Sequence, residues 1–304
     1  MASSDSKTLI TIVGPTAIGK TALSIALAKE FSTEIISADS RQFFREMEIG
    51  TAKPTKEELD AALHHFINSH SINEFFSTGD FEVQALKVIN TIFQKKDILI
   101  MVGGSGLYID AVCKGLDDLP ETDLDIRNEL NRQLEKEGID KIRTQLKKYD
   151  PEYFAKVDRA NPQRLIRGLE FFLSTGQKIS DFYTNSSKSR PFNILKIGLN
   201  MDRTHLYERI NMRVDQMMKE GLLEEVRNLL PSRKLNALNT VGYTELFDHL
   251  DGHISLEEAV EKIKQNTRRF AKRQLTWFRK DNSIKWFDPG QDSAVISYIK
   301  ENLH

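Results

Sequence analysis

The sequence predicts an α/β fold in which helices flank a parallel sheet and an all-helical insertion interrupts the chain. Short apolar strands alternate with helical segments, and the first strand leads directly into a Gly-x-x-x-x-Gly-Lys-Thr loop. From about residue 114 to 193 the strand signal disappears, while apolar residues continue at helical spacing. We expect a core at 1–113 and 194–304 and an insertion at 114–193. Alternatively, the helices at 114–193 belong to the α/β core, and the strands that pair with them are not recognised in the sequence.

The loop follows Leu9–Val13, a β-branched apolar stretch typical of a buried parallel strand, and precedes a helix over 22–29. Its glycines allow a tight turn with inward N–H groups, and the helix N-terminus adds further donors. The pattern is typical of P-loop proteins, which include ATP-binding and other nucleotide-binding proteins. A chance match in a Gly-containing turn is the alternative. We expect phosphate binding at Gly14, Pro15, Thr16, Ala17, Ile18, Gly19, Lys20 and Thr21.

Three side chains in or beside this loop suggest chemistry. Lys20 is placed to reach the terminal phosphates, and the Thr21 hydroxyl is a candidate Mg²⁺ ligand. Asp39 follows a second strand at 34–38, and parallel strands end along one edge of their sheet. Asp39 should therefore lie beside the loop, where it could hold magnesium through water or act as a general base. It could instead cap the next helical turn.

The later strands carry fewer polar groups. A third strand at 97–102 ends in Gly103 and Gly104, where phosphate-transferring relatives of the P-loop often place a magnesium-binding Asp. This argues against an ATPase or kinase, and glycines let a ligand or another backbone approach closely. A strand at 196–201 returns the chain to the sheet before a helix with Arg209 and Arg213 on one face. These arginines could instead pair with neighbouring acids at the surface.

Two segments suggest contact with RNA. In the insertion, Asn161 and Pro162 begin a helix that Gly176 ends, with Arg164 and Arg167 on one face. The second segment, 262–280, has aromatic residues between its basic ones, which suits a phosphate backbone and unstacked bases. Solvated charges and core aromatics are the alternative for both. Its eight basic residues, with no acidic one, are Lys262, Lys264, Arg268, Arg269, Lys272, Arg273, Arg279 and Lys280.

Composition limits the remaining possibilities. The net charge of −1 gives no global argument for nucleic acid, and the single cysteine excludes an intrachain disulfide. The first seven residues lack the apolar core of a signal peptide, and no apolar run is long enough for a membrane span. We expect a cytoplasmic monomer without membrane contact. His64, His65 and His70 suggest zinc, but we expect them to pack or hydrogen-bond, because a fourth ligand is not evident.

Taken in order, the motifs resemble the tRNA dimethylallyltransferase family, also called tRNA isopentenyltransferase. The resemblance covers about residues 8–288 and is specific because of the order and spacing of its parts. Besides the phosphate loop it includes Ser-x-Asp-Ser at 37–40, Gly50-Thr-Ala-Lys-Pro, His64-His65, Val102-Gly-Gly-Ser-Gly-Leu-Tyr, Asn161-Pro-Gln-Arg-Leu, Val241-Gly-Tyr and Ala271-Lys-Arg-Gln-Leu-Thr-Trp.

The resemblance implies transfer of the dimethylallyl group of dimethylallyl diphosphate to N6 of an adenosine. That adenosine lies immediately 3′ of the anticodon in tRNAs that read codons beginning with U. The loop would hold the leaving diphosphate, and Thr16, Lys20, Arg213 and Mg²⁺ would stabilise it while Asp39 acts as base. The implied tRNA contacts are Asp39, Ser40, Arg41, Gln42, Ser105, Arg127, Gln163, Arg164, Leu165, Ile166, Arg167, Arg269 and Arg273.

Three other functions are compatible with parts of the sequence. An adenylate isopentenyltransferase shares the chemistry but uses a free nucleotide, which needs neither the insertion nor the basic segment. A P-loop kinase of a small metabolite would consume ATP. A non-catalytic RNA-binding regulator would use the loop only as a phosphate clamp, which the presence of Asp39, Lys20 and Arg213 together disfavours.

Overall fold

The computed structural model describes residues 7–184 and 187–303. The chain divides into two compact units: one runs to Lys114 and resumes at Ser189, and the other comprises Gly115–Lys188. The boundaries expected from sequence, 113/114 and 193/194, lie near these. Residues 1–6, 185–186 and 304 belong to the expected domains but lie outside the described residues. The first six of these make up most of the N-terminal segment that lacks the apolar core of a signal peptide.

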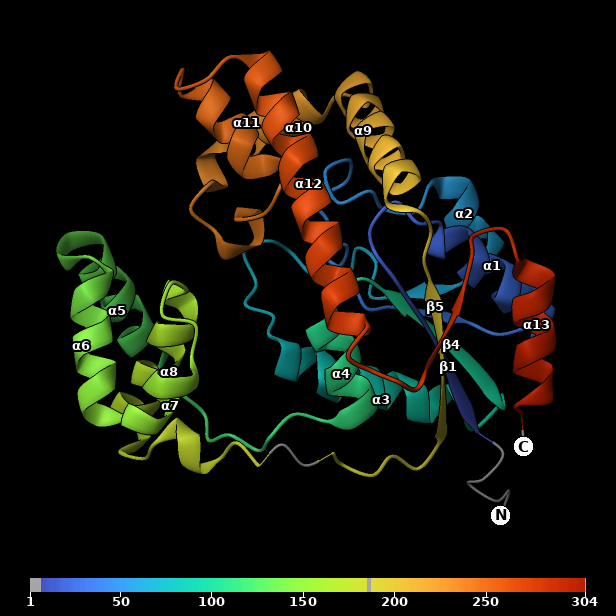
Figure 1. The fold of residues 1–304 in the computed structure, drawn as a ribbon, viewed down its shortest axis with the longest axis horizontal. Helices are drawn as coiled ribbons and strands as arrows, with labels where there is room; N and C mark the ends of the chain where they lie inside the picture. The colour runs from blue at the N-terminus through green and yellow to red at the C-terminus, as the bar shows by residue number, and fades with distance from the viewer. Residues whose placement is uncertain (1–6, 185–186, 304) are drawn as a thin grey trace. The chain divides into compact units, whose positions relative to one another are not determined.

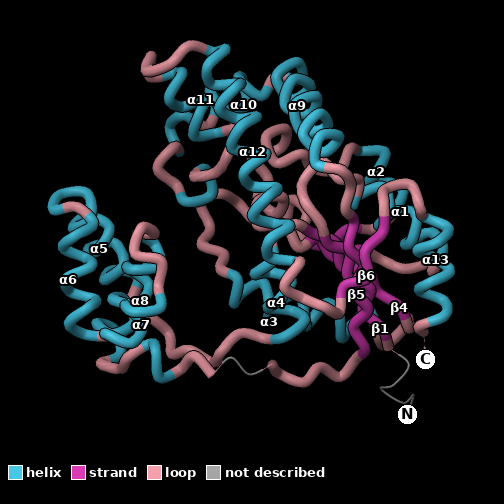
Figure 2. The backbone as a smooth tube through the Cα atoms, viewed as in Figure 1, coloured by secondary structure: helices cyan, strands magenta, loops and turns pink. Residues whose placement is uncertain are grey.

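The first unit contains a parallel sheet of six strands in the order β3-β2-β4-β1-β5-β6 (Figure 2). The strands are β1 (Thr8–Val13), β2 (Ile35–Ser37), β3 (His64–His65), β4 (Ile98–Gly103), β5 (Asn193–Leu199) and β6 (Ile284–Phe287). In the centre, Val13 pairs with Gly103 on one side and with Gly198 on the other. The expected α/β fold is confirmed, and the carboxyl ends of β1, β2 and β4 meet at one edge.

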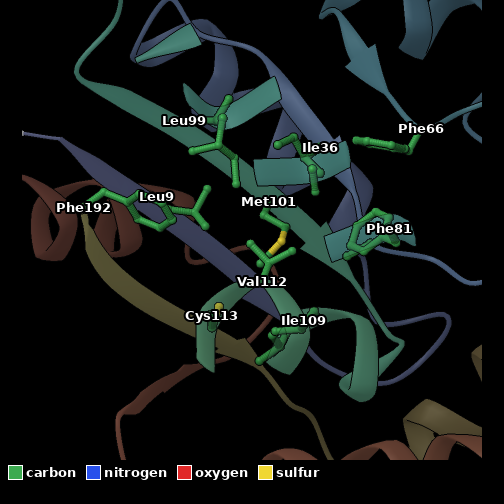
Figure 3. Packing of buried hydrophobic residues seen from close by; sticks show 14 of the residues in the cluster. Leu9, Ile36, Phe66, Phe81, Leu99, Met101, Ile109, Val112, Cys113 and Phe192 are labelled. Atoms are coloured by element: carbon green, nitrogen blue, oxygen red, sulfur yellow. The ribbon is translucent and has the colours of Figure 1, made fainter. Parts of the chain in front are cut away.

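Helices cover both faces of this sheet because successive strand residues point to opposite sides. Leu9, Ile36 and Met101 pack against α3 (Thr78–Ile92) and α4 (Gly106–Lys114), where Val112 and Cys113 are buried (Figure 3). The opposite face packs against α1 (Lys20–Glu30) and α13 (Asp292–Glu301), which lie on the same side of the sheet in Figure 1. The sheet therefore has a buried core on each face. These cores hold the strands in place at the edge where the phosphate loop begins.

A further group of helices belongs to the same unit. It consists of α9 (Arg203–Glu220), α10 (Leu222–Asn228), α11 (Tyr243–Leu250) and the long α12 (Leu256–Phe278), while the short α2 (Lys56–Ala61) precedes β3. Val214, Leu246 and Ile263 form a core with Phe43 and Met47 of the loop after β2. In Figure 1, α12 extends from α11 to α4. One helix thus reaches from this group to the sheet edge.

The described part of the second unit contains helices joined by loops, and no strand. It contains α5 (Leu124–Glu137), α6 (Ile139–Tyr149), α7 (Pro151–Lys156) and α8 (Pro162–Thr175), packed around Leu130, Leu146 and Leu169. Asn161 caps α8 by accepting from the Arg164 N–H, Pro162 stands in the first turn, and Gly176 ends the helix at φ +72°. No helix in the described part of the chain is both long and apolar enough to cross a membrane.

Candidate functional site: two joined cavities at the edge of the sheet

The phosphate loop connects β1 to α1 by a turn that requires glycine. Gly14 has φ +145°, and a side chain there would meet the Leu199 carbonyl oxygen at 2.7 Å; Gly19, with φ +105°, precedes α1. The side chain of Ile18 is fully buried, so this residue can reach a ligand only through its backbone. Gly14 and Pro15 are also buried, and neither lines the cavity beside the loop. These two residues shape the turn, while residues 16–21 face the cavity.

This first cavity has a volume of about 460 Å³ and is built for an anion. It contains Lys20, Arg213 and the N-terminus of α1. Burial, and to a smaller extent nearby Arg213, lower the pKa of Lys20 to about 7 against the opposing charge of Asp39. Without a ligand, the Lys20 ammonium donates to the Pro15 carbonyl at 2.7 Å. A bound diphosphate would replace that weak acceptor and favour the charged amine.

Arg213 connects the loop to the segment that follows β2. Its Nη1 donates to Thr16 Oγ1 at 3.3 Å, and its Nη2 donates to the Ala52 carbonyl at 3.3 Å. Burial lowers the pKa of the Arg213 guanidinium, and the charge of Asp39 raises it. From sequence, ion pairs between Arg213 and neighbouring surface acids were considered, and the described residues form no such pair. The guanidinium instead lines both the first cavity and a second one.

The second cavity, of about 470 Å³, adjoins the first. Its lining provides many hydrogen-bonding groups, from the loop after β2, the turn after β4, the segment that leads into α11, α11 itself and α12. They include Ser40, Arg41, Ser105, Asn239, Thr244, Asn266 and Arg273. The residues that line both cavities are Thr16, Asp39, Thr51, Ala52, Arg213 and Phe270. Two cavities of similar volume, one of them basic, therefore meet at Thr16, Asp39 and Arg213.

Asp39 lies at this meeting point and also stabilises its own turn. Its Oδ1 accepts from the backbone N–H groups of Arg41 at 2.9 Å and Gln42 at 3.3 Å. The capping interaction considered from sequence is thus present, and it uses only one carboxylate oxygen. Since Asp39 lines both cavities, the turn holds the side chain where a substrate could reach its other oxygen.

The structure gives the neighbouring predicted residues mainly internal contacts. The amide of Gln42 donates to the carbonyls of Thr51 and Ala52 at 3.2 and 3.1 Å and accepts from Ser37. The Ser105 hydroxyl accepts from the Ser40 N–H at 3.1 Å. Burial lowers the pKa of Arg41, which donates to the Asn239 carbonyl at 3.4 Å. These groups shape the walls of the cavities.

The histidines do not form a metal centre. His64 hydrogen-bonds the Ala62 carbonyl, His65 pairs with Glu34 at 2.7 Å, and His70 stacks on Phe76 at 3.8 Å. Within residues 7–184 and 187–303, no group of three or more His, Cys, Asp or Glu is placed to hold a metal ion.

The basic residues of α12 separate into two groups. Lys264 pairs with Asp215 and Glu261 at 2.8 and 3.0 Å, and Arg268 donates to Asn211 at 2.6 Å. Arg269 and Arg273 are exposed, and Arg273 lies over the ring of Phe270, itself 37 % exposed. Of the interleaved aromatics, Phe278 is buried, while Trp277 is part-exposed and donates to Asp110. Only part of the basic segment is therefore available to a polyanion.

Within the helical unit, the predicted RNA-binding residues also separate. Gln163, Arg164 and Arg167 line a surface cavity of about 550 Å³ together with Tyr153 and Tyr183. The interpretation of Leu165 and Ile166 as contact residues is wrong for their side chains, because both are buried in the core of this unit at 0 and 1 % exposure. A helix with one face against a core cannot present five consecutive side chains to a partner.

Arg127 has a structural partner. Its Nε and Nη2 donate to the carboxylate of Glu170 at 3.1 and 2.7 Å, and Glu170 is fully buried. Thr122 also donates to Glu170 at 2.7 Å. Arg127 therefore neutralises a buried charge, and its contact with RNA stays a prediction.

Two residues without a predicted role, Glu225 and Gln274, join the motifs around the site. Glu225 accepts the N–H groups of Glu48, Ile49 and Gly50 and the Tyr243 hydroxyl, so it links the Gly50-Thr51-Ala52 segment to Val241-Gly242-Tyr243. Gln274 links the phosphate loop to Gly104. Gln274 is spaced with Ala271 and Phe278 on a buried face of α12, and a polar residue on that face was the available signal.

The comparisons with known proteins agree with this architecture. The profile of the IPP transferase family matches residues 42–281. A tRNA dimethylallyltransferase of Christiangramia forsetii is 54 % identical over 297 residues, covering 97 % of this chain and 98 % of the relative. The crystal structure of the full-length tRNA isopentenylpyrophosphate transferase of Bacillus halodurans is 40 % identical, with a TM-score of 0.72 and coverage of 98 and 97 %.

A more distant structure shows how far the fold extends. A eukaryotic dimethylallyltransferase described as acting on tRNA is 27 % identical, with a TM-score of 0.80, and covers 97 % of this chain and 80 % of its own. These relatives match nearly the whole of the present chain, including the phosphate loop that precedes residue 42. On this evidence the chain belongs to the IPP transferase family, the family of the tRNA dimethylallyltransferases.

Proposed function

We propose that this protein transfers the dimethylallyl group of dimethylallyl diphosphate to N6 of the adenosine immediately 3′ of the anticodon, in tRNAs that read codons beginning with U. Family membership supports the reaction class. The observation that carries the proposal is the junction of the two cavities at Thr16, Asp39 and Arg213. A transfer reaction needs a donor and an acceptor that meet at one point, with charge stabilisation on the donor side.

In this reaction the diphosphate binds in the first cavity. The inward N–H groups of the loop, the N-terminus of α1, Lys20 and Arg213 neutralise the charge that builds on the bridging oxygen as the C–O bond breaks. The allylic carbon tolerates partial positive charge, so stabilisation of the leaving group makes the larger contribution. The Thr16 hydroxyl, fixed by Arg213, adds a hydrogen bond on the same side.

The adenine enters the second cavity, which requires that it leave the stack of the anticodon loop. Its N6 attacks the allylic carbon, the C–O bond breaks, and diphosphate leaves. Asp39 accepts a hydrogen bond from N6 and takes the proton released as the new C–N bond forms. This orientation matters because the N6 lone pair is delocalised into the purine and is a poor nucleophile.

Magnesium fits the donor site as an ion held largely by the substrate. Thr21 lines the cavity, and its hydroxyl is an oxygen ligand of the kind that would hold this ion. When bound, Mg²⁺ would neutralise charge on the leaving diphosphate.

The tRNA is held by polar side chains, of which Arg167 is half-buried and donates to Thr122, while the others are exposed. Arg269 and Arg273 on α12, and Gln163, Arg164 and Arg167 on α8, provide these contacts. A free nucleotide would use few of them.

An acceptor competition tests this proposal. Labelled dimethylallyl diphosphate and Mg²⁺ are supplied with equal concentrations of AMP and an unmodified anticodon stem-loop. We expect label on the stem-loop alone, with diphosphate released in equal amount. Label on AMP would indicate a free-nucleotide enzyme, and label on neither would overturn the proposal.

A further inference from the structure

Gln274 is a buried polar residue on α12 that contacts the phosphate loop directly. Its side chain is nearly inaccessible, at 6 % exposure. Its Oε1 accepts the N–H of Thr16 at 2.9 Å, and its Nε2 donates to the Gly104 carbonyl at 2.9 Å. One amide thus joins the turns that follow β1 and β4, across 258 and 170 residues of sequence. Both of its polar ends are satisfied, which fixes the orientation of the side chain.

The glycine at 104 makes this arrangement possible. A side-chain carbon on Gly104 would lie 2.2 Å from Gln274 Nε2, far inside contact distance. Gly103 is constrained similarly, because a Cβ there would lie 2.2 Å from the Ala38 carbonyl oxygen. These two glycines stand where many P-loop proteins carry an acidic residue. The space that a side chain would need there is filled by the Ala38 backbone beside Gly103 and by the Gln274 amide beside Gly104.

The Thr16 N–H is the one loop amide that donates to a side chain, among hydrogen bonds of the described residues. On the other side of the same residue, the Thr16 hydroxyl accepts from Arg213. The backbone of Thr16 is thus held by α12 and its side chain by α9. Thr16 also lines both cavities, so its orientation determines which donor faces the breaking C–O bond.

We propose that Gln274 is a positioning residue for group transfer, acting through Thr16. It occupies the Thr16 N–H, so that the hydroxyl rather than the backbone amide is presented at the junction of the cavities. This inference rests on the proposed function, since it assigns a role within that reaction. Misplacement of a reacting group by about 1 Å can cost on the order of 100-fold in rate. Loss of Gln274 should therefore lower kcat rather than donor affinity.

The first test replaces the amide by an isosteric apolar chain, Gln274→Met. We expect kcat to fall about 10- to 100-fold, while KM for dimethylallyl diphosphate changes less than about threefold. Gln265→Met is the matched control, because Gln265 is on the same helix but exposed. Wild-type kcat and thermal unfolding are expected for the control. A Gln274→Met protein with wild-type kcat would overturn the inference.

A double-mutant cycle distinguishes positioning from general support of the fold. If Gln274 acts through Thr16, Gln274→Met should lower kcat by less than about threefold in a Thr16→Ala background. The same full loss in both backgrounds would show that Gln274 acts independently of Thr16, and would contradict the proposal. Should Gln274→Met unfold, Gly104→Ala displaces the same amide from the opposite side and is expected to give the same cycle.

Activity of the wild-type protein distinguishes a failure of this inference from a failure of the proposed function. If it transfers no dimethylallyl group to RNA, the proposed function fails. If it does so and the cycle is additive, only the role of Gln274 fails.

Discussion

Arg213 donates to the hydroxyl of Thr16 at 3.3 Å and, with its other terminal nitrogen, to the Ala52 carbonyl at 3.3 Å. The two contacts use the planar fork of the guanidinium, which an ammonium cannot reproduce. The charge of Arg213 therefore reaches the donor cavity in a fixed direction.

Arg213→Lys keeps the charge and removes that geometry. We expect kcat to fall about 10- to 100-fold with a smaller effect on KM for dimethylallyl diphosphate, because directed charge matters most as the C–O bond breaks. Steady-state kinetics with Arg203→Lys provide the control, since Arg203 is exposed on the same helix and lines neither cavity. Equal losses in both variants would contradict a specific role for Arg213.

Asp39→Asn separates the base from the turn. The amide oxygen of Asn can still accept from the N–H groups of Arg41 and Gln42, so the turn should persist. We expect kcat to fall about 10²- to 10⁴-fold while the Kd for tRNA changes less than about threefold. Single-turnover rates and binding titrations measure the two quantities. Similar losses in both would make Asp39 a binding residue and not the base.

Lys20 should take up a proton when diphosphate binds at alkaline pH. Burial and Arg213 lower its pKa to about 7 in the free protein, so at pH 8.5 the amine is mostly neutral. A diphosphate beside it favours the charged form and raises that pKa, which requires proton uptake. Calorimetry of pyrophosphate binding in buffers of different ionisation enthalpy measures this uptake. We expect uptake of nearly one proton per pyrophosphate at pH 8.5 and of less at pH 6. The Lys20→Met variant should lack this contribution at both pH values. Identical uptake by that variant at pH 8.5 would refute the assignment.

Replacement of Arg127 should lower the stability of the helical unit, whereas replacement of Arg164 should weaken tRNA binding. Arg127→Met leaves the buried Glu170 carboxylate without its main counter-charge, which should destabilise the helical unit by about 3 kcal/mol. Arg164→Met removes an exposed cation and should weaken tRNA binding with little change in stability. Hydrogen exchange of α5 and α8 amides, with binding titrations, measures both effects. A stable Arg127→Met protein with weakened binding would restore Arg127 as an RNA contact.

The two groups of basic residues on α12 should differ in their salt dependence. Replacing exposed Arg269 and Arg273 by Met is expected to weaken tRNA binding and to reduce the slope of log K against log salt by about 1 to 2. Lys264→Met should have a smaller effect, because Lys264 already pairs with Asp215 and Glu261. An equal change of slope for Lys264→Met would show that these ion pairs open when RNA binds.

The sequence predicted the sheet where its strands are apolar and its turns are chemically distinctive. Glycine spacing in the loop and the cap at Asn161 depend on local geometry, and both are as expected. Two strands were missed: β3, which consists of two histidines and carries no apolar pattern, and the four-residue β6. The exclusion of Leu165 and Ile166 from the surface of α8 required knowing which face of that helix packs on the core.

The links between motifs depend on contacts that are distant in sequence. Glu225 satisfies three backbone N–H groups more than 170 residues away, and Gln274 reaches Thr16 across 258 residues. A single sequence gives the residue type in each case but not its partner. For the same reason Arg127 was expected only as an RNA contact, and its pairing with a buried carboxylate was not predicted.

The most direct test of the account is mass spectrometry of an unmodified tRNA with adenosine at the last anticodon position and at its 3′ neighbour. The tRNA is incubated with this protein, Mg²⁺ and dimethylallyl diphosphate, then digested and sequenced by fragmentation. We predict the mass of one dimethylallyl group on the 3′ neighbour alone. Transfer to the anticodon adenosine instead, or to no residue of the tRNA, would contradict the proposed function.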